Sequence, residues 1–210
     1  MLSPSAFTGG ESVPSSAQGS ANLADRSFRA LKQKLQKLAI SRMNKNPQQM
    51  PDDSRLDQAM QWALEDARQA AALSEVPVGA VLVAPDGELM GRAHNEIETR
   101  SDPTAHAERL VLSACCVRLG APRVPPGCLL AVTLEPCAMC AGAIVLARVD
   151  HLIFGAADPK TGACGSLRDV VRDPRLNHRV TLHEPRFGEA CGQMLTEFFR
   201  ARRGKGKPHG

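Results

Sequence analysis

The sequence predicts an α/β protein, a three-layer α/β/α sandwich around a mixed five-stranded sheet. Short apolar runs alternate with segments of helical periodicity along most of the chain. A turn, Pro85-Asp86-Gly87, joins the first two apolar runs as a hairpin. That antiparallel pair would sit beside parallel strands, so the sheet is expected to be mixed.

The first helix is expected at about 55–73, because apolar residues recur there on one face. Strands are expected at 78–84 and 89–94, on either side of the turn. The segment Asp102-Pro103-Thr104 reads as a helix start and predicts a helix over 105–118.

Further along, we expect a strand at 128–134 and a helix over 137–147, with Pro136 in the first helical turn. The remaining elements are expected in the order strand, polar loop, short helix, strand and final helix. Their approximate ranges are 149–154, 155–167, 167–171, 178–182 and 188–202.

Composition divides the chain into three parts: an N-terminal extension (1–50), a folded domain (51–203) and a basic C-terminal tail (204–210). Residues 1–25 are rich in Ser, Gly, Ala and Pro and are expected to be disordered. A cationic amphipathic helix is expected over 27–43. Met50 opens a segment that would make a complete domain, so the extension is expected to be dispensable for catalysis.

The formal charge of +4 is unevenly distributed. Residues 1–50 and 200–210 each carry a net charge of +5, whereas residues 51–199 carry −6. Basic ends suit a phosphate-rich partner. They are also explained as solvated tails, and charge alone favours that second interpretation.

Neither an apolar run long enough to cross a bilayer nor a secretory signal is apparent, so a soluble, cytoplasmic protein without membrane association is expected. Seven cysteines, an odd number, argue against a complete disulfide framework. Cys137 and Cys140 form a Cys-x-x-Cys pair. The other five are expected to serve as small buried apolar residues.

Two short segments supply metal ligands: His106-Ala107-Glu108 and Pro136-Cys137-Ala138-Met139-Cys140. One His and two Cys are three zinc ligands, and a catalytic zinc leaves its fourth position open. Cys137 and Cys140 lie three residues apart at a helix start, where they face the same way and the helix dipole favours thiolates. We therefore predict one Zn²⁺ held by His106, Cys137 and Cys140.

Glu108 is a carboxylate that the metal does not need, and we predict that it is the general acid/base. In the middle of a helix, residues 106 and 108 would point about 200° apart. Both can reach one cavity only in a terminal turn, which is a condition that the structure must meet. The pattern H-x-E followed by P-C-x-x-C is typical of zinc-dependent nucleobase deaminases.

Two other interpretations of these motifs are open. Cys137 and Cys140 could be a redox pair, which would leave His106 and Glu108 without a role. They could also belong to a structural zinc site, with His94 or His151 as the fourth ligand. We favour the catalytic site because both segments occur together.

Five segments resemble the bacterial tRNA-specific adenosine deaminases, members of the cytidine/deoxycytidylate deaminase-like zinc family. The similarity covers about residues 55–203. The zinc motifs would fit any cytidine, guanine or adenosine deaminase, whereas the segments after Phe154 are more specific. The five segments are EVPVGAV (75–81), DPTAHAE (102–108), TLEPCAMCAGA (133–143), FGAADPKTGACGSL (154–167) and NHRV (177–180).

This resemblance implies a cytidine-deaminase-like fold and the zinc-dependent hydrolysis of adenosine to inosine at the wobble position of a tRNA anticodon. It also implies one zinc per subunit and a homodimer that binds the anticodon stem-loop with both subunits. By resemblance, Asn95 hydrogen-bonds the adenine ring and Val78 packs against its face. Asp158 and Asn177 hold the ribose or backbone of the target nucleotide.

Each of these four residues also has a plain structural explanation. Val78 could belong to the core, Asn95 to a turn, Asp158 to a turn cap and Asn177 to a strand start. Pro159 departs from the family pattern after Asp158. The basic residues at the end of the chain could bind phosphates or be solvated charges, and they are Arg200, Arg202, Arg203, Lys205 and Lys207.

Two rival functions share parts of this pattern. A free nucleobase or nucleoside deaminase, acting on guanine or cytidine, would have the same zinc site and a different pocket. A non-catalytic RNA-binding or zinc-structural module would have no need of Glu108, so that residue argues against it.

Overall fold

The computed structural model describes residues 50–205, so the helix expected at 27–43 lies outside the described residues, as do residues 206–210. Helices and strands alternate within the described part as the sequence predicts. In chain order they are α2 (Asp53–Ala72), β1 (Gly79–Val83), β2 (Leu89–His94), α3 (Ile97–Arg100), α4 (Ala107–Leu119), β3 (Leu129–Leu134), α5 (Ala138–Ala147), β4 (His151–Ala156), β5 (Thr181–Leu182) and α6 (Gly188–Lys205).

The sheet has five strands in the order β2-β1-β3-β4-β5. β1 pairs antiparallel with both β2 and β3, whereas β3 with β4 and β4 with β5 are parallel. The predicted mixed five-stranded sheet is therefore confirmed. Its parallel half brings the carboxyl ends of β3 and β4 to one edge, where the chain leaves β3 to enter α5.

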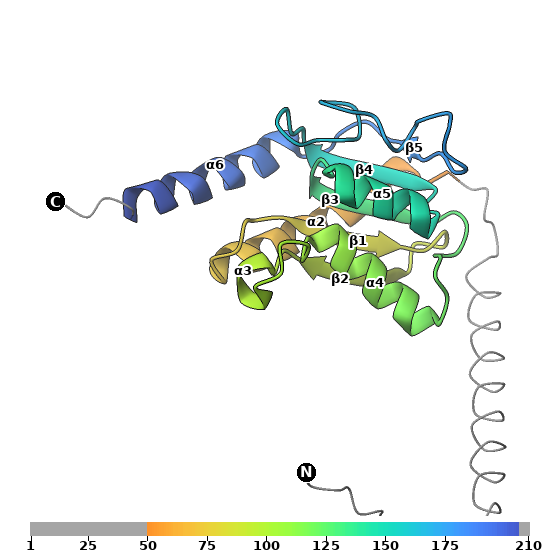
Figure 1. The fold of residues 1–210 in the computed structure, drawn as a ribbon, viewed down its shortest axis with the longest axis horizontal. Helices are drawn as coiled ribbons and strands as arrows, with labels where there is room; N and C mark the ends of the chain where they lie inside the picture. Colours follow the sequence, from red (N-terminus) through yellow and green to blue (C-terminus); the bar gives the residue numbers. More distant parts are fainter. Residues whose placement is uncertain (1–49, 206–210) are drawn as a thin grey trace, which may run out of the picture. The chain divides into compact units, whose positions relative to one another are not determined.

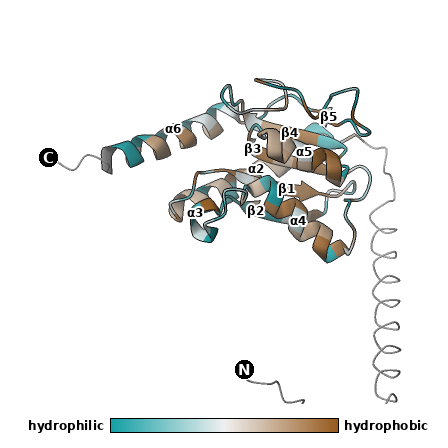
Figure 2. Cartoon of the chain, in the orientation of Figure 1, coloured by the Kyte–Doolittle hydropathy of each residue, from teal (hydrophilic) through white to brown (hydrophobic). Residues whose placement is uncertain are grey.

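Helices cover both faces of the sheet, as Figure 1 shows, and pack on it to make two apolar cores. The alternation of side chains along β1 divides them: Ala80 and Leu82 face α4 and α5, whereas Val81 and Val83 face α2. Cys191 brings α6 into the core on the α2 side. Every residue of α5 is apolar, and Figure 2 shows this helix mostly brown. The three-layer sandwich is therefore confirmed.

The structure differs from expectation at four places. α3 is a four-residue helix that the sequence did not predict. The short helix expected at 167–171 was wrong, because the backbone there pairs with neighbouring loop residues, as in the bridge between Cys164 and Asp169. Strand β5 has only two residues. Asp102 caps the turn at Thr104 rather than the helix that follows.

Among the described helices, none combines the length and apolar character needed to cross a bilayer. The cysteines outside the Cys-x-x-Cys pair behave as expected: all five are free thiols, and four are buried, namely Cys115, Cys128, Cys164 and Cys191.

Candidate active site

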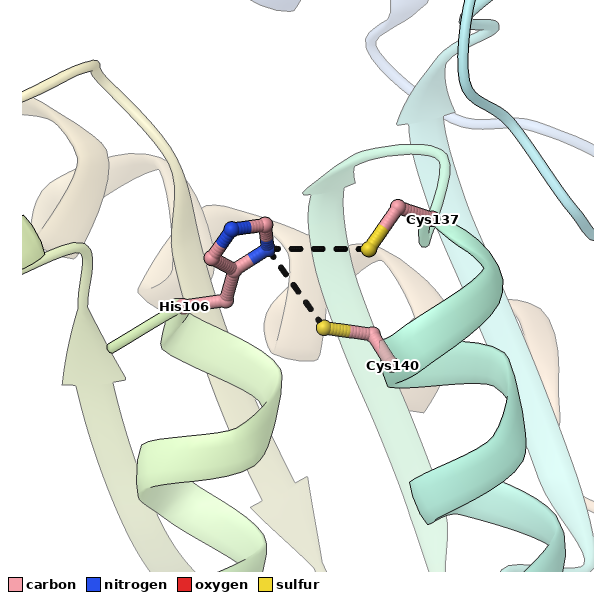
Figure 3. A group of neighbouring side chains, drawn as sticks. All are labelled: His106, Cys137 and Cys140. Carbon is pink, nitrogen blue, oxygen red and sulfur yellow. Dashed lines mark hydrogen bonds between the residues drawn. The ribbon is translucent and has the colours of Figure 1, made fainter. Parts of the chain in front are cut away.

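His106, Cys137 and Cys140 come together at the amino-terminal ends of α4 and α5 (Figure 3). The Nδ1 atom of His106 lies 3.7 Å from the Sγ of Cys137 and 3.6 Å from the Sγ of Cys140. The three ligand atoms all lie within 4.8 Å of one another. Within residues 50–205, this is the one group of three or more His, Cys, Asp or Glu side chains whose ligand atoms lie close enough to hold a metal ion.

The donor set fits zinc. A tetrahedral ion with Zn–S of about 2.3 Å and Zn–N of about 2.0 Å would separate a sulfur from a nitrogen by about 3.5 Å, close to the observed 3.7 and 3.6 Å. His94 and His151, considered above as fourth ligands, lie elsewhere: His94 contacts the carbonyl of Asn95, and His151 contacts His183. Three protein ligands favour a catalytic site over a structural one.

Helix ends prepare these ligands for a cation. Cys137 is the N-cap of α5, and His106 is the N-cap of α4 with an extended backbone (φ −75°, ψ 148°). Neither side chain caps its own helix, so both are available to the metal. Instead, the Ala107 amide donates to Oδ1 of Asn95 at 3.0 Å, which satisfies one free N–H of α4.

Hydrogen bonding shifts the proton equilibrium of these ligands. The hydrogen bond with Cys140, and then the one with His106, lower the pKa of the Cys137 thiol well below its usual value. The contact with Cys137 raises the pKa of His106. The cluster therefore already stabilises a thiolate, which is the form that zinc binds.

Glu108 meets the geometric condition set by the sequence. It lies in the first turn of α4, two residues after the extended N-cap His106, and both line the same cavity. Its side chain is buried, with 3% exposed, and its Oε2 atom has no hydrogen-bond partner. Burial raises the pKa of this carboxyl above its usual value. A buried carboxyl with one unpartnered oxygen beside three candidate metal ligands is available to a substrate or a water.

The cavity in front of these residues has a volume of about 200 Å³. This is below the roughly 300–1,000 Å³ typical of pockets for drug-sized ligands, so it suits a single small group. Its apolar walls are Val76, Val78, Ile97 and Leu134. Its polar residues, besides His106, Glu108 and Cys137, are Asn95, Glu135, Asp158 and Thr161.

Two of the four predicted substrate residues line the cavity deep in the protein. Val78 is part of the core, as its structural explanation expected, and it also lies in the cavity wall. Asn95 is 5% exposed, and its Oδ1 is occupied by the Ala107 amide. The Nδ2 donor of Asn95 is therefore the group that remains for a ligand.

The other two predicted substrate residues are placed differently. Asp158 lines the cavity, but its carboxylate also caps the following turn by accepting from the amides of Lys160 and Thr161. Asn177 is exposed and accepts a hydrogen bond of 2.6 Å from Arg148, at the carboxyl end of α5. The structure does not bring Asn177 to the cavity, and its expected place at a strand start is also wrong, because β5 begins at Thr181.

Sequence reasoning missed two buried carboxylates, Glu75 and Glu135. Glu75 accepts from the amides of Glu98 at 3.2 Å and Thr99 at 2.6 Å, and so holds α3. Glu135 lines the cavity and accepts from the amides of Asp158, Cys164 and Ser166. The sequence signal for both was weak: a charged residue beside a buried strand.

Residues 53–156 match the family model of the cytidine and deoxycytidylate deaminase zinc-binding region. The tRNA-specific adenosine deaminase of Bacillus subtilis (strain 168) is 47% identical over 148 residues, which are 70% of this chain and 91% of that protein. This chain belongs to the tRNA-specific adenosine deaminase family. The resemblance stated from the motifs is thereby confirmed, and the zinc-binding region of the family contains the His-Cys-Cys cluster.

Another family member and a solved structure agree with this assignment, and a more distant deaminase shares the fold. The family member from Haemophilus influenzae (strain ATCC 51907) is 44% identical over 151 residues, 70% of this chain and 84% of that protein. A solved structure from a study of A-to-I editing by tRNA:A34 deaminases is 41% identical, with a TM-score of 0.63 over 66% of this chain and 99% of that one. Guanine deaminase from Nitrosomonas europaea shares the fold alone, with 22% identity, a TM-score of 0.59 and coverage of 76% and 91%.

Proposed function

We propose that this protein catalyses the zinc-dependent hydrolysis of adenosine to inosine and ammonia at the wobble position of a tRNA anticodon. The observation that carries the proposal is the unpartnered, buried Oε2 of Glu108 in a small cavity beside three zinc ligands. The family membership and the tRNA:A34 deaminase structure support the same substrate.

His106, Cys137 and Cys140 would hold the zinc. When bound, Zn²⁺ supplies Lewis acidity that brings the pKa of a coordinated water towards neutrality. Glu108 accepts the proton that the water loses as it adds to the adenine ring. The carboxyl passes this proton to the ring nitrogen, then takes the remaining proton of the added hydroxyl and passes it to the departing amine, so that ammonia leaves and inosine remains.

The cavity walls suit a purine that has left its stack. Deaminases that act on a base in a nucleic acid must first extrude it into a pocket, and an anticodon loop makes this inexpensive because its bases are single-stranded. Val78 and the other apolar residues would contact the ring faces. The Nδ2 group of Asn95 would donate to a ring acceptor, because its Oδ1 is already occupied.

Asp158 and Asn177 are proposed to contact the sugar or backbone of the nucleotide, in different ways. Asp158 lies at the cavity, where its carboxylate can accept from a ribose hydroxyl while it caps the turn. Asn177 lies at the other end of α5 in its own subunit. It can contribute only where the RNA extends that far or where a second subunit presents it.

We also propose that the enzyme is a homodimer that acts in the cytoplasm. The outer faces of α4 and α5 expose large apolar side chains. Val117 of α4 is 74% exposed and Leu146 of α5 is 75% exposed, and Met139 of α5 is also exposed. Such a surface is expected to bind a partner, and a second copy of this chain is the partner we propose. Sedimentation of the wild type and Leu146→Glu tests it: the variant is expected to be monomeric.

Residues 51–203 are proposed to be the catalytic domain. The relatives cover about 70% of the chain, and α2 begins at Asp53 with its first turn capped by Asp52. Removal of residues 1–49 is expected to leave turnover unchanged.

The test of the function is the identity of the product. The zinc-loaded protein is incubated with an anticodon stem-loop carrying adenosine at the wobble position, and in parallel with free guanine and cytidine. We expect inosine in the RNA and no ammonia from the free compounds. Ammonia from guanine or cytidine with unchanged RNA would establish the rival function instead.

A further inference from the structure

The loop over residues 158–168 follows β4 and brings Asp158 and Thr161 to the cavity. Three of its amides donate to one carboxylate, that of Glu135. Oε2 accepts from the amide of Asp158 at 3.0 Å, and Oε1 accepts from the amides of Cys164 and Ser166, both at 3.0 Å. The hydroxyl of Ser166 donates to Oε2 as well.

The loop is also fastened to the two residues after Glu135. The Ala163 amide donates to the carbonyl of Pro136 at 2.8 Å, and Gly162 pairs with Cys137 in a β-bridge. The approach is tight, because a Cβ added at Gly162 would lie 2.4 Å from the Glu135 carboxyl carbon. Three consecutive residues, ending in a metal ligand, therefore hold the loop.

We propose that Glu135 is a positioning residue that fixes the 158–168 loop relative to Cys137 and so sets the shape of the cavity that receives the base. That the cavity receives a base rests on the proposed function. Glu135 is not itself placed to bind that occupant. A carboxylate has about four acceptor positions, and the four donors from the loop occupy them.

The negative charge is needed for this arrangement. All four contacts are donors, so a carboxylate satisfies them with both oxygens. A glutamine would present an NH₂ group to two of the donors, and that half of the contact would become repulsive. Glu135→Gln therefore detaches part of the loop while it keeps the size of the side chain.

The first experiment compares the zinc-loaded wild type with Glu135→Gln on the anticodon stem-loop. We expect zinc content to stay at one per subunit, KM to rise by about 10- to 100-fold and kcat to stay within about threefold, because misplacement of about 1 Å costs up to 100-fold. A role in stability alone would lower the active fraction, so kcat would fall at constant KM. That result would overturn the proposal.

Ser166→Ala keeps the test decisive if Glu135→Gln folds poorly. Ser166 is exposed, and the substitution removes one of the four donors while Oε2 of Glu135 keeps the Asp158 amide. We expect KM to rise by about 2- to 10-fold, in line with the loss of one hydrogen bond. An unchanged KM in this variant would contradict the proposal.

Amide hydrogen exchange tests the anchoring without RNA. In Glu135→Gln, the amides of Asp158, Cys164 and Ser166 are expected to exchange faster, whereas those of β3 keep their protection. Equal protection in both proteins would overturn the proposal. Absence of inosine with the wild type would instead reject the proposed function, and the exchange measurement would still decide whether Glu135 anchors the loop.

Discussion

Glu108 and Glu135 are the same residue type and line the same cavity, and both have little exposed surface, 3% for Glu108 and 2% for Glu135. Their surroundings differ. Glu108 has an oxygen without a partner, and burial raises its pKa. Burial acts on Glu135 in the same direction, but the hydrogen bonds from Ser166, Asp158 and Cys164 outweigh it and hold its pKa below the usual value.

The comparison shows that hydrogen-bond donors oppose the effect of burial and so help to decide what a buried carboxylate does. Where an oxygen lacks a donor, the charged form is less well solvated, so the group takes up a proton more readily and can return it to a reacting atom. With a full set of donors, the charged form is stable and fixed in place. One site thus contains a proton carrier and a structural anion 27 residues apart in the sequence.

Glu108→Gln gives the largest expected effect. The amide keeps the shape of the side chain but cannot carry the proton, so kcat should fall by about 10²- to 10⁴-fold. Zinc content, measured by atomic emission, should stay at the wild-type level because Glu108 is not among the three ligands. Glu108→Ala should behave alike. Loss of zinc in both variants would contradict the assignment.

Asn95→Asp distinguishes the role of the Oδ1 acceptor of Asn95 from that of its Nδ2 donor. The new carboxylate still accepts from the Ala107 amide, so α4 keeps its cap, but the donor in the cavity is lost. We expect KM for the stem-loop to rise by about tenfold or more, with the melting temperature near that of the wild type. A wild-type KM would show that Asn95 serves only the helix.

Glu75→Gln tests whether a second buried carboxylate that holds backbone amides also affects the cavity. Glu75 holds the amides of Glu98 and Thr99, beside Ile97 in the cavity wall. Loss of its charge-assisted hydrogen bonds should lower the free energy of unfolding by about 1–3 kcal/mol. KM should change less than in Glu135→Gln, because Ile97 offers only an apolar contact. Urea unfolding and steady-state kinetics measure the two effects.

The buried pair His151 and His183 shows how burial acts on side chains that become positively charged. The expected effect of this pair on stability is the smallest of the four. Nε2 of His183 lies 3.2 Å from Nδ1 of His151, and burial lowers the pKa of both. Asp150 opposes the shift at His151, whereas Arg186 adds to it at His183.

The unfolded chain binds protons at these histidines below about pH 6.5, where the folded protein still resists protonation. The free energy of unfolding should therefore be unaffected by this pair above pH 6.5 and fall as the pH decreases below it. Urea unfolding at pH 7.5 and 5.5 measures the decrease, which should be smaller in His183→Asn. An equal decrease in both proteins would exclude the pair as its source.

Local signals were enough for much of the fold. Strand β2 was predicted to the residue, because the turn before it fixes its start and its alternation is clear. The helix after Pro136 and the ligands Cys137 and Cys140 were predicted for the same reason: the information lies within a few residues.

What the sequence could not show depends on contacts between distant residues. α3 is held by Glu75, more than 20 residues earlier, and the 158–168 loop by Glu135 across 23 to 31 residues. No periodicity records such contacts, so α3 was missed, and a helix was expected at 167–171 where the chain instead pairs with loop residues. Asn177 was assigned by resemblance, which carries no information on its contact with Arg148.

The most direct test of the distinction between the two carboxylates is the single-turnover rate of inosine formation at saturating stem-loop, with zinc-loaded wild type, Glu108→Gln and Glu135→Gln. Saturation removes differences in binding, so only the chemical step is compared. We predict that Glu135→Gln converts the wobble adenosine at nearly the wild-type rate and that Glu108→Gln does so at least 100-fold more slowly, on the order of a lost acid/base catalyst. Wild-type conversion by Glu108→Gln would contradict the account.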